Sequence, residues 1–239
     1  MTPTDSTRYG LVNQGGFFSP YYLFEMLARQ HGDELDPNGR SANRLSLRQL
    51  YRRVHARLGQ GSSRSEAWQA WQRELLEALG FLPGPLQPLT AVLPTRHHGD
   101  VPITHAAYPV NNPQSPVSSL QPPLVYIDTH GFATDLDHDR YAARGPITAA
   151  TTEEPIARAV ELALDQGEAR WAILLSGDEM RLYRKGGSVA RQYLQVNFAP
   201  LFDADRDEEW VAFWGLFRYA AFVPGDDGKC LLDRVLEAS

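Results

Sequence analysis

The run WAILLS, residues 171–176, constrains the fold most, because its five consecutive apolar residues leave it no polar face. A strand that is apolar on both faces belongs in the middle of a sheet, with a layer of structure over each face. The runs EMRLYRK at 179–185 and ARQYLQVNF at 190–198 follow it and have the composition of strands. Gly177 and Asp178 separate the first two runs and are typical of a hairpin turn. The sequence therefore predicts an α/β fold with a mixed sheet and flanking helices.

Helical periodicity surrounds these strands. Helices are expected over residues 19–31, 45–58, 65–79, 151–166 and 203–222. Ser19 can cap the first helix, and Pro20 suits its first position. Thr151 and Glu154 have the spacing of a capping box, and Asp205 can cap the last of the five helices.

The sequence becomes rich in proline after residue 81, which marks a change of structure. Short strands are expected at 89–93, 101–108 and 124–128. We therefore predict a helical lobe over residues 1–82 and an α/β domain over residues 83–239. A last amphipathic segment, 231–236, stops at Ser239 without a cap, which is typical of a cut inside a larger protein.

Composition sets the broad class of the protein. The chain has 239 residues, of which 43% are hydrophobic and 22% charged, enough for a substantial core. It has no run of eighteen apolar residues, and MTPTDSTRYG lacks the pattern of a signal peptide. We therefore expect a cytoplasmic protein without membrane contact. The single cysteine, Cys230, excludes an internal disulfide and is expected to be a semi-buried apolar residue.

Positive charge is concentrated in one segment, although the formal net charge is −6. Residues 40–64 contain no acidic residue and seven arginines, namely Arg40, Arg44, Arg48, Arg52, Arg53, Arg57 and Arg64. On a helix, Arg44, Arg48 and Arg52 line one flank, and Arg53 and Arg57 line the other. This pattern favours contact with DNA phosphates or with the acidic surface of a partner. The alternative is a solvated helix face.

Several familiar catalytic motifs are absent. The stretch LLSGDEMRLYRKG, residues 174–186, holds a serine, two acids and three bases, but it lacks the glycine pattern and the following helix of a nucleophile elbow. A turn is the better interpretation. The chain also lacks a phosphate-binding P-loop, a dinucleotide-binding glycine motif and a Cys-x-x-Cys pair. His97 and His98 are interpreted as part of a polar turn rather than as metal ligands.

An acidic loop invites a metal interpretation. Asp135, Asp137 and Asp139 match the first three ligand positions of a calcium loop. However, Arg140 occupies the position of the required glycine, and Pro146 that of the bidentate glutamate. The sequence therefore favours a solvated loop.

Three segments together resemble one family. LVNQGGFFSPYYLFEML resembles the N-terminal signature of large adenine-specific DNA methyltransferases, the type IIG restriction-modification enzymes and their relatives in BREX and DISARM phage-defence systems. RWAILLSGDEMRLYRKGGSVARQYLQVNFAPLF resembles their hairpin, and EEWVAFWGLFRYAAF and LLDRVLEAS resemble the helix and linker before their methyltransferase domain. The resemblance covers nearly the whole chain, and its motifs are structural rather than catalytic.

The resemblance implies a fold and candidate site residues. The N-terminal region of that family is related to PD-(D/E)XK nucleases, in which acids on adjacent strands hold Mg²⁺ and a lysine helps to activate water. Asp100 then corresponds to the first acid, and Asp128-Thr129-His130 to the acid-x-lysine motif, with Asp100 and Asp128 as metal ligands. His130 departs from the lysine, because a neutral imidazole is a poorer cation at pH 7. A nuclease-like scaffold without activity is therefore favoured.

The methyltransferase signatures themselves are missing. We find neither a glycine-rich S-adenosylmethionine loop nor an Asn-Pro-Pro-Tyr-type motif for a flipped adenine. The resemblance thus implies a fragment or separate N-terminal subunit that cannot methylate alone. Three functions follow: a module that binds DNA or a partner subunit, a Mg²⁺-dependent endonuclease that uses Asp100 and Asp128, or a pure protein-interaction module.

Overall fold

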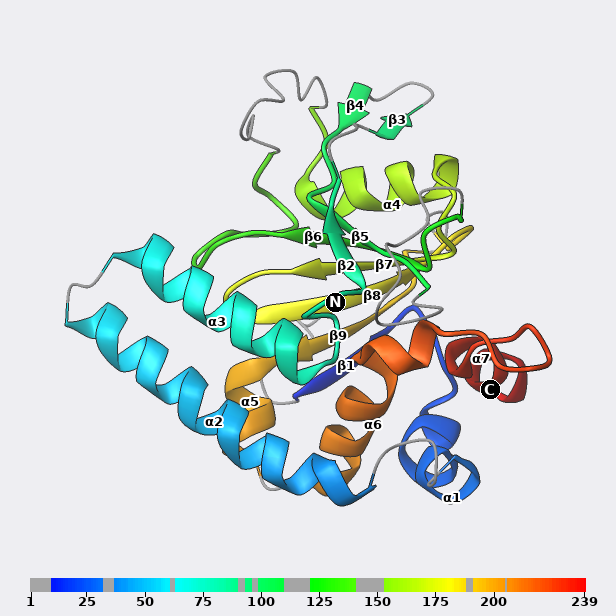
Figure 1. Ribbon diagram of the computed structural model, residues 1–239, viewed down its shortest axis with the longest axis horizontal. Coiled ribbons are helices and arrows are strands. Elements are labelled where there is room, and N and C mark those ends of the chain that lie inside the picture. Colours follow the sequence, from blue (N-terminus) through cyan, green and yellow to red (C-terminus); the bar gives the residue numbers. More distant parts are fainter. Residues whose placement is uncertain are drawn as a thin grey trace, which may run out of the picture.

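The computed structural model describes residues 10–31, 37–60, 63–89, 93–95, 99–109, 121–140, 153–187, 191–204 and 206–239 (Figure 1). For residues 37–42 it describes the backbone only. None of the described helices is both long enough and apolar enough to cross a membrane.

A seven-stranded mixed sheet lies at the centre of the molecule (Figure 1). Its order is β1 (Leu11–Gln14), β9 (Tyr193–Asn197), β8 (Glu179–Arg184), β7 (Trp171–Leu175), β6 (Val125–Thr129), β5 (His105–Ala107) and β2 (Leu86–Pro88). All five residues of β7 are buried, and β7 is the middle strand of the seven. The predicted central strand is therefore confirmed, as is the α/β class. A separate two-stranded sheet pairs β3 (Leu93–Thr95) with β4 (Gly99–Val101).

One parallel pair makes the sheet mixed. β6 runs parallel to β7, and α4 (Ile156–Gln166) lies between them in the chain. Every other neighbouring pair of strands is antiparallel. The hairpin β7–β8 turns at Ser176, Gly177 and Asp178, where the Ser176 N–H donates to the carbonyl of Glu179 at 2.8 Å. The predicted turn in LLSGDEMRLYRKG is therefore confirmed.

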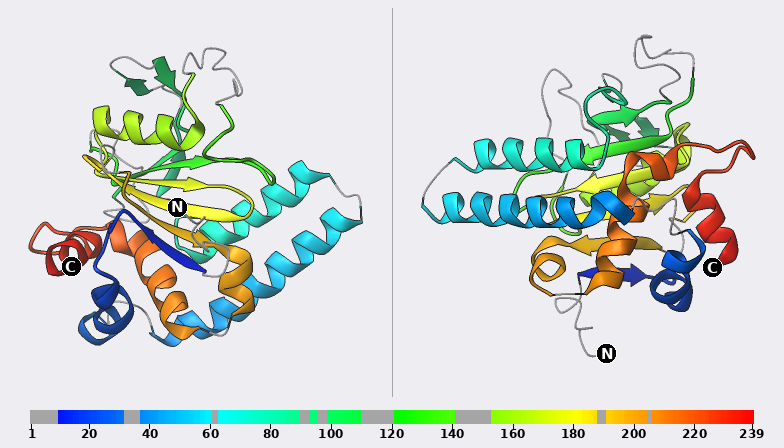
Figure 2. Two further views of the ribbon diagram at one scale, coloured as in Figure 1. Left: turned by 180° about the vertical axis from the view of Figure 1, so that it is seen from behind. Right: turned by 60° about the horizontal axis from the view of Figure 1, so that its bottom comes forward.

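The two faces of the sheet carry different layers (Figure 2). The α4 face, named after the helix that covers part of it, buries a small cluster that includes Tyr126, Val160 and Leu174. The opposite face, here the helical face, is covered by α2 (Pro37–Gly59), α3 (Arg64–Ala78), α5 (Phe198–Asp203) and α6 (Asp207–Phe217). These helices and the sheet share one large hydrophobic cluster.

That large cluster contains residues from both sides of position 82. Trp71 of α3 is fully buried, and its ring lies 5.1 Å from the ring of Phe198 and 5.3 Å from that of Tyr51. At the sheet edge, β1 also comes from the first 82 residues and pairs with β9. Residues before position 82 thus contribute an edge strand and a helical layer to the same core as the strands that follow.

The N-terminal helix begins where the sequence predicts. Residues 20–30 are helical, and the Leu23 N–H donates to the carbonyl of Ser19 at 2.9 Å. Its interior is the π-helix η2 (Tyr22–Met26), and α1 (Leu27–Gln30) completes the helix. The buried Cys230 likewise agrees with its predicted apolar role.

Several predicted boundaries are wrong. α2 begins at Pro37 rather than at residue 45. The prediction missed its first two turns because they are polar and show no apolar stripe, although proline at a first helical position was an available signal. α4 begins at Ile156, after the extended residue Pro155, so the predicted start at 151 is wrong, and Thr151 itself lies outside the described residues. The strand expected over 101–108 breaks between β4 and β5, and residues 90–92 of the strand expected at 89–93 lie outside the described residues.

The helix predicted over 203–222 is in fact three elements. α5 ends at Asp203, α6 spans Asp207–Phe217, and a 3-10 turn spans Tyr219–Phe222. Ala204 and Arg218 are extended, and they interrupt the helical hydrogen bonds at the two breaks. Asp205, the predicted cap, lies outside the described residues. The last segment forms α7 (Leu231–Ala238), as the sequence predicts.

Candidate functional site

The three residues matched to a nuclease site lie on two different sheets. Asp128 is the fourth residue of β6 and His130 follows that strand directly, whereas Asp100 is half-buried in the middle of β4. Residues two apart on a strand share a face, so the spacing Asp-x-His places both side chains on the α4 face. The sequence motif therefore does correspond to a real side-chain pair.

Asp128 and His130 form a buried pair. The Nε2 atom of His130 lies 2.6 Å from Oδ2 of Asp128, and both side chains are 0% exposed. An ionised carboxylate can only accept, so the imidazole N–H at Nε2 donates to it. The other oxygen, Oδ1, accepts from the backbone N–H of Thr104 at 3.2 Å, and the His130 N–H donates to the carbonyl of Leu175 at 2.7 Å. The pair is thus held between the end of β6, the end of β7 and Thr104, the residue before β5.

This arrangement does not suit a catalytic Mg²⁺ ion. Such an ion keeps several water ligands, but the side chain of Asp128 is 0% exposed, and each of its oxygens already accepts one hydrogen bond. Within the described ranges, no group of three or more His, Cys, Asp or Glu side chains could hold a metal ion. As folded, the Asp128–His130 pair is suited to holding the end of β6 in place.

The carboxylates of the acidic loop are hydrogen-bonded to groups of the protein. Asp135 accepts from the backbone N–H groups of Asp137 and His138 and from the His138 ring, which lowers the pKa of Asp135 and raises that of His138. The two oxygens of Asp137 accept from Arg181, and Asp139 accepts from the Asp135 N–H. These hydrogen bonds stabilise the loop in a turn conformation. Pro146, His97 and His98 lie outside the described residues.

Two of the predicted DNA-binding arginines are used inside the fold. Arg44 donates to Asp207 at 2.6 Å and to the carbonyl of Ala204 at 3.2 Å, and its guanidinium lies over the ring of Trp210. Arg52 donates to Asp203 at 3.0 Å. Both therefore connect α2 to the termini of α5 and α6, a role that the spacing of arginines alone could not reveal.

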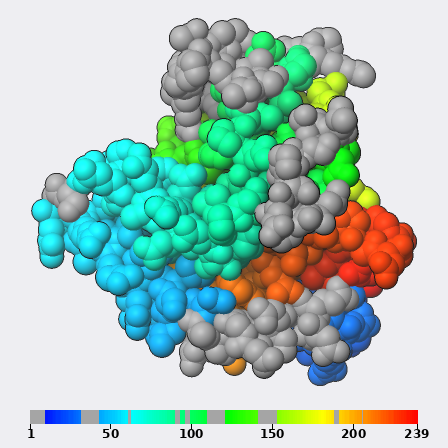
Figure 3. All heavy atoms as spheres, viewed as in Figure 1, coloured from blue at the N-terminus to red at the C-terminus, as the bar shows by residue number. Residues whose placement is uncertain are grey.

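The remaining arginines divide by exposure. Arg48 is half-buried, whereas Arg53, Arg57 and Arg64 are exposed. Across the part of the chain that the structure describes, no carboxylate forms an ion pair with any of these three exposed arginines. By their positions near the end of α2 and at the start of α3, they lie toward the tip of the α2–α3 hairpin. This hairpin projects from the body (Figures 1 and 3). The side chain of Arg40 lies outside the described residues.

A buried arginine on β8 was not expected from the sequence. Arg181 is only 4% exposed and donates to both oxygens of Asp137 at 2.7 and 2.8 Å and to Glu179 at 3.0 Å. Its guanidinium also lies 5.0 Å from the ring centroid of Tyr193. Burial alone would lower the pKa of Arg181, but the two carboxylates raise it, so the residue stays charged. Burial raises the pKa of Glu179 despite the arginine beside it.

The sequence missed this cluster because alternation along β8 indicates only which residues share a face. Met180 and Leu182 point to the helical face, and Arg181 and Tyr183 to the α4 face. Asp137 is 44 residues away in the chain, and no local pattern links it to the strand. The only available signal was an arginine between two apolar residues of a strand that is expected to lie next to the central one.

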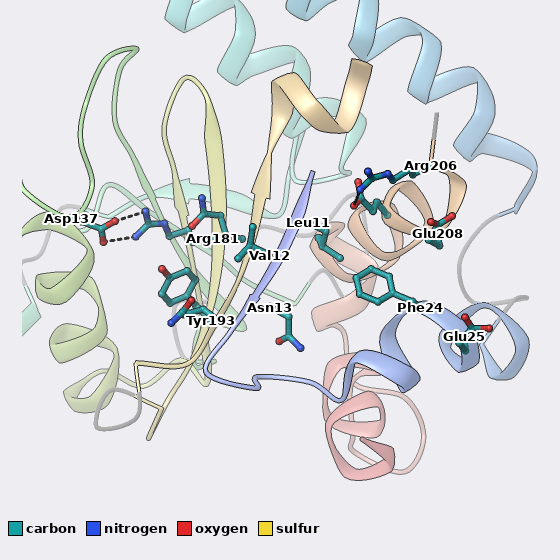
Figure 4. A pocket seen from close by; sticks show the side chains of 13 residues that line it. Leu11, Val12, Asn13, Phe24, Glu25, Asp137, Arg181, Tyr193, Arg206 and Glu208 are labelled. Atoms are coloured by element: carbon teal, nitrogen blue, oxygen red, sulfur yellow. Dashed lines mark hydrogen bonds and ion pairs between the residues drawn. The ribbon is translucent and has the colours of Figure 1, made fainter. Parts of the chain in front are cut away.

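A large cavity lies beside this cluster, at the edge of the sheet (Figure 4). It has a volume of about 1200 Å³ and runs along β1. One side is formed by Arg181, Tyr193 and Val12, and the other by Phe24 and Glu208, among other residues. The cavity is therefore bounded by the open part of the α4 face and by the elements beyond β1.

Comparisons of the chain with protein-family models, with curated proteins and with solved structures found no match. The function is therefore inferred from the residues and geometry of the chain itself.

Proposed function

We propose that the protein is a nuclease-like module that binds duplex DNA without cleaving it, as the N-terminal fragment or subunit of a restriction-modification or phage-defence adenine methyltransferase. The observation that carries the DNA-binding part is the set of exposed arginines at the α2–α3 hairpin, Arg53, Arg57 and Arg64, which have no carboxylate partner among the described residues.

The order of elements supports the nuclease-like part of the proposal. Antiparallel β5 and β6 are followed by α4 and by β7, which is parallel to β6. The Asp-x-His motif stands at the end of β6, where the resemblance places an acid-x-lysine motif. A single crossover helix between neighbouring parallel strands is the usual connection of such a sheet. The strand order is thus compatible with the scaffold that the sequence resemblance implies.

Helix geometry supports phosphate contact by the hairpin. Arg53 and Arg57 are four residues apart on α2, so they lie on one face about 6 Å apart along the axis. Arg64 begins α3 just beyond the turn. Exposed arginines that are free of acidic partners can release counterions from DNA, whereas Arg44 and Arg52 would first have to leave Asp207 and Asp203.

The DNA-binding proposal predicts a change in salt dependence. We expect the triple variant Arg53→Gln, Arg57→Gln, Arg64→Gln to bind a duplex more weakly, and its log–log slope of affinity against salt to fall by up to about 2.7, or about 0.9 for each lost phosphate contact. Fluorescence anisotropy with a labelled duplex at several salt concentrations measures both quantities.

A matched control separates this surface from net charge. Arg29→Gln, Arg140→Gln, Arg191→Gln removes the same charge from exposed positions on other elements and should leave the slope unchanged. Equal slopes for the wild-type protein and the hairpin variant, or equal losses in both variants, would refute the assigned surface.

The alternative function, a Mg²⁺-dependent endonuclease that uses Asp100 and Asp128, predicts cleavage. We expect none: supercoiled plasmid should remain intact with Mg²⁺ or Mn²⁺, because Asp128 is sealed and already hydrogen-bonded. An agarose-gel nicking assay provides the measurement. Nicking by the wild-type protein that disappears in Asp128→Ala would establish the endonuclease and overturn the proposal of an inactive scaffold.

A further inference from the structure

The two edges of the central sheet are built differently. β2 at one edge is three residues long and ends in Pro88, and proline is a common protection against strand addition. β1 at the other edge reads Leu-Val-Asn-Gln, without a proline or a charge. Within the described ranges, no strand pairs with the outer side of β1. This edge therefore lacks the proline and the charged side chains by which proteins often prevent strand pairing.

The register identifies the backbone groups at this open edge. The Asn197 N–H donates to the carbonyl of Gly10 at 2.8 Å, so Gly10 and Asn197 form a hydrogen-bonded pair. Hydrogen-bonded pairs recur every second residue, which makes Val12 and Gln14 the next residues to face β9. The backbone groups of Leu11 and Asn13 consequently point away from β9, as the donors and acceptors that an added strand would use.

The cavity along β1 provides space on both sides of this edge. Its volume of about 1200 Å³ exceeds that of an ordinary small-molecule pocket, and it extends beside all four residues of β1. On the α4 face, the cavity is lined by Val12 and Tyr193, and on the other side by Phe24 with the exposed ends of η2 and α6 (Figure 4). A chain in extended conformation would fit such a long, open groove.

The charges that line the groove specify the occupant. Its two arginines are matched by carboxylates of the same groove, Arg181 by Asp137 and Arg206 by Glu209. Two acids remain. Glu208 is exposed and has no ion-pair partner in the described part of the chain, and Glu25 lies 4.0 Å from the exposed Arg29. Both project from the side formed by η2 and α6, so the groove carries an excess of negative charge there (Figure 4).

We propose that the open edge of β1 accepts an extended, basic segment of a partner protein as an eighth strand of the sheet. Its main-chain groups pair with those of Leu11 and Asn13. Alternate side chains face the two walls, so apolar residues contact Val12 and Tyr193, and lysine or arginine residues face the acidic wall. A second copy of this chain is a poorer occupant, because pairing β1 with itself would bring the acidic walls together.

A pair of synthetic peptides of about nine residues tests the proposal. One peptide alternates lysine with valine, and the other has glutamate in place of every lysine. Whether the peptide runs parallel or antiparallel to β1, its charged residues face one wall and its valines face the other. We expect the lysine peptide to bind to the protein. Hydrogen exchange of the backbone amides should then slow at residues 10–16 and not at β2, the other edge of the sheet. We expect the glutamate peptide to bind at least about tenfold more weakly.

Charge reversal distinguishes this groove from nonspecific attraction. The double variant Glu25→Lys, Glu208→Lys should prefer the glutamate peptide. It should bind the lysine peptide about tenfold more weakly, and the glutamate peptide about tenfold more tightly, than the wild-type protein does. The control Glu74→Lys, Glu168→Lys makes the same change in net charge at exposed positions on α3 and after α4, and should keep the wild-type preference.

Each other outcome overturns the proposal. These outcomes are absence of lysine-peptide binding, binding without protection of residues 10–16, and an unchanged preference after reversal. Concentration-dependent dimerisation with protection of the same residues in the absence of peptide would assign the edge to a second copy. None of these results depends on DNA, so loss of DNA binding by the hairpin variant leaves this test unaffected.

Discussion

Replacing Arg181 with methionine is expected to lower the free energy of unfolding by about 3 kcal/mol, because the change removes the buried cation from a network of carboxylates. Glu179 is the main source of the loss. Its side chain is 17% exposed, whereas that of Asp137 is 52% exposed and can be solvated after the arginine is lost. Urea denaturation followed by circular dichroism gives the difference between the variant and the wild-type protein.

The loss should depend on pH in a defined direction. Burial raises the pKa of Glu179, and Arg181 opposes that shift, so the variant raises the pKa further. A carboxyl group whose pKa is raised by folding destabilises the protein above that pKa and ceases to do so once it is protonated. We therefore expect the deficit to be larger at about pH 7.5 than at about pH 5.

Two further variants test the explanation. Arg181→Met, Glu179→Gln should recover part of the lost stability, because the uncompensated buried charge is removed. Arg181→Lys should be intermediate, since an ammonium group keeps the charge but cannot donate to both oxygens of Asp137 in parallel. A loss in Arg181→Met below about 1 kcal/mol, equal at both pH values, would show that the cluster is a solvated surface pair.

The second large effect is expected at Trp71. Trp71→Ala should lower the free energy of unfolding by about 4 kcal/mol, because it leaves a cavity among Tyr51, Phe198 and Phe202. Tyr51 comes from α2, and Phe198 and Phe202 come from α5, so the cavity lies where the first 82 residues meet the rest of the chain. The Trp71→Ala variant should still unfold in one transition.

Trp68 on the same helix is a matched control. It is half-buried and contacts Phe132 at a ring distance of 5.9 Å, so Trp68→Ala should cost less than half as much as Trp71→Ala. Two separate transitions in either variant, seen as different urea midpoints for far-ultraviolet and tryptophan signals, would instead establish residues 1–82 as an independent lobe.

The strands from β7 to β9 were the most predictable part of the fold. A run that is apolar on both faces has no stable position at a sheet edge, so WAILLS had to be central, and Gly177-Asp178 had to turn. Helix boundaries were less predictable. α2 begins with polar residues, and the helix breaks occur at Ala204 and Arg218, which are neither proline nor glycine. Packing against neighbouring helices and strands determines such boundaries more than local propensity does.

The candidate site was only partly predictable. The spacing of Asp128 and His130 correctly places both on one face of β6, since that depends on strand geometry alone. Their burial depends on neighbouring strands, and the bond from the Thr104 N–H to Oδ1 of Asp128 depends on a residue 24 positions away. The seven arginines also looked equivalent in the sequence, yet Asp207 and Asp203 bind Arg44 and Arg52 from more than 150 residues away.

The sequence by itself determined the α/β class, the central strand, its hairpin and the concentration of arginine on α2, because each depends on local periodicity, turn chemistry or composition. Only the tertiary structure decided which arginines stay exposed, that Arg181 is a buried cation, and that β1 is an edge strand among the described residues, beside a groove with two acids on one side. These properties depend on contacts between residues far apart in the chain, and a linear pattern carries no information about the distance between them.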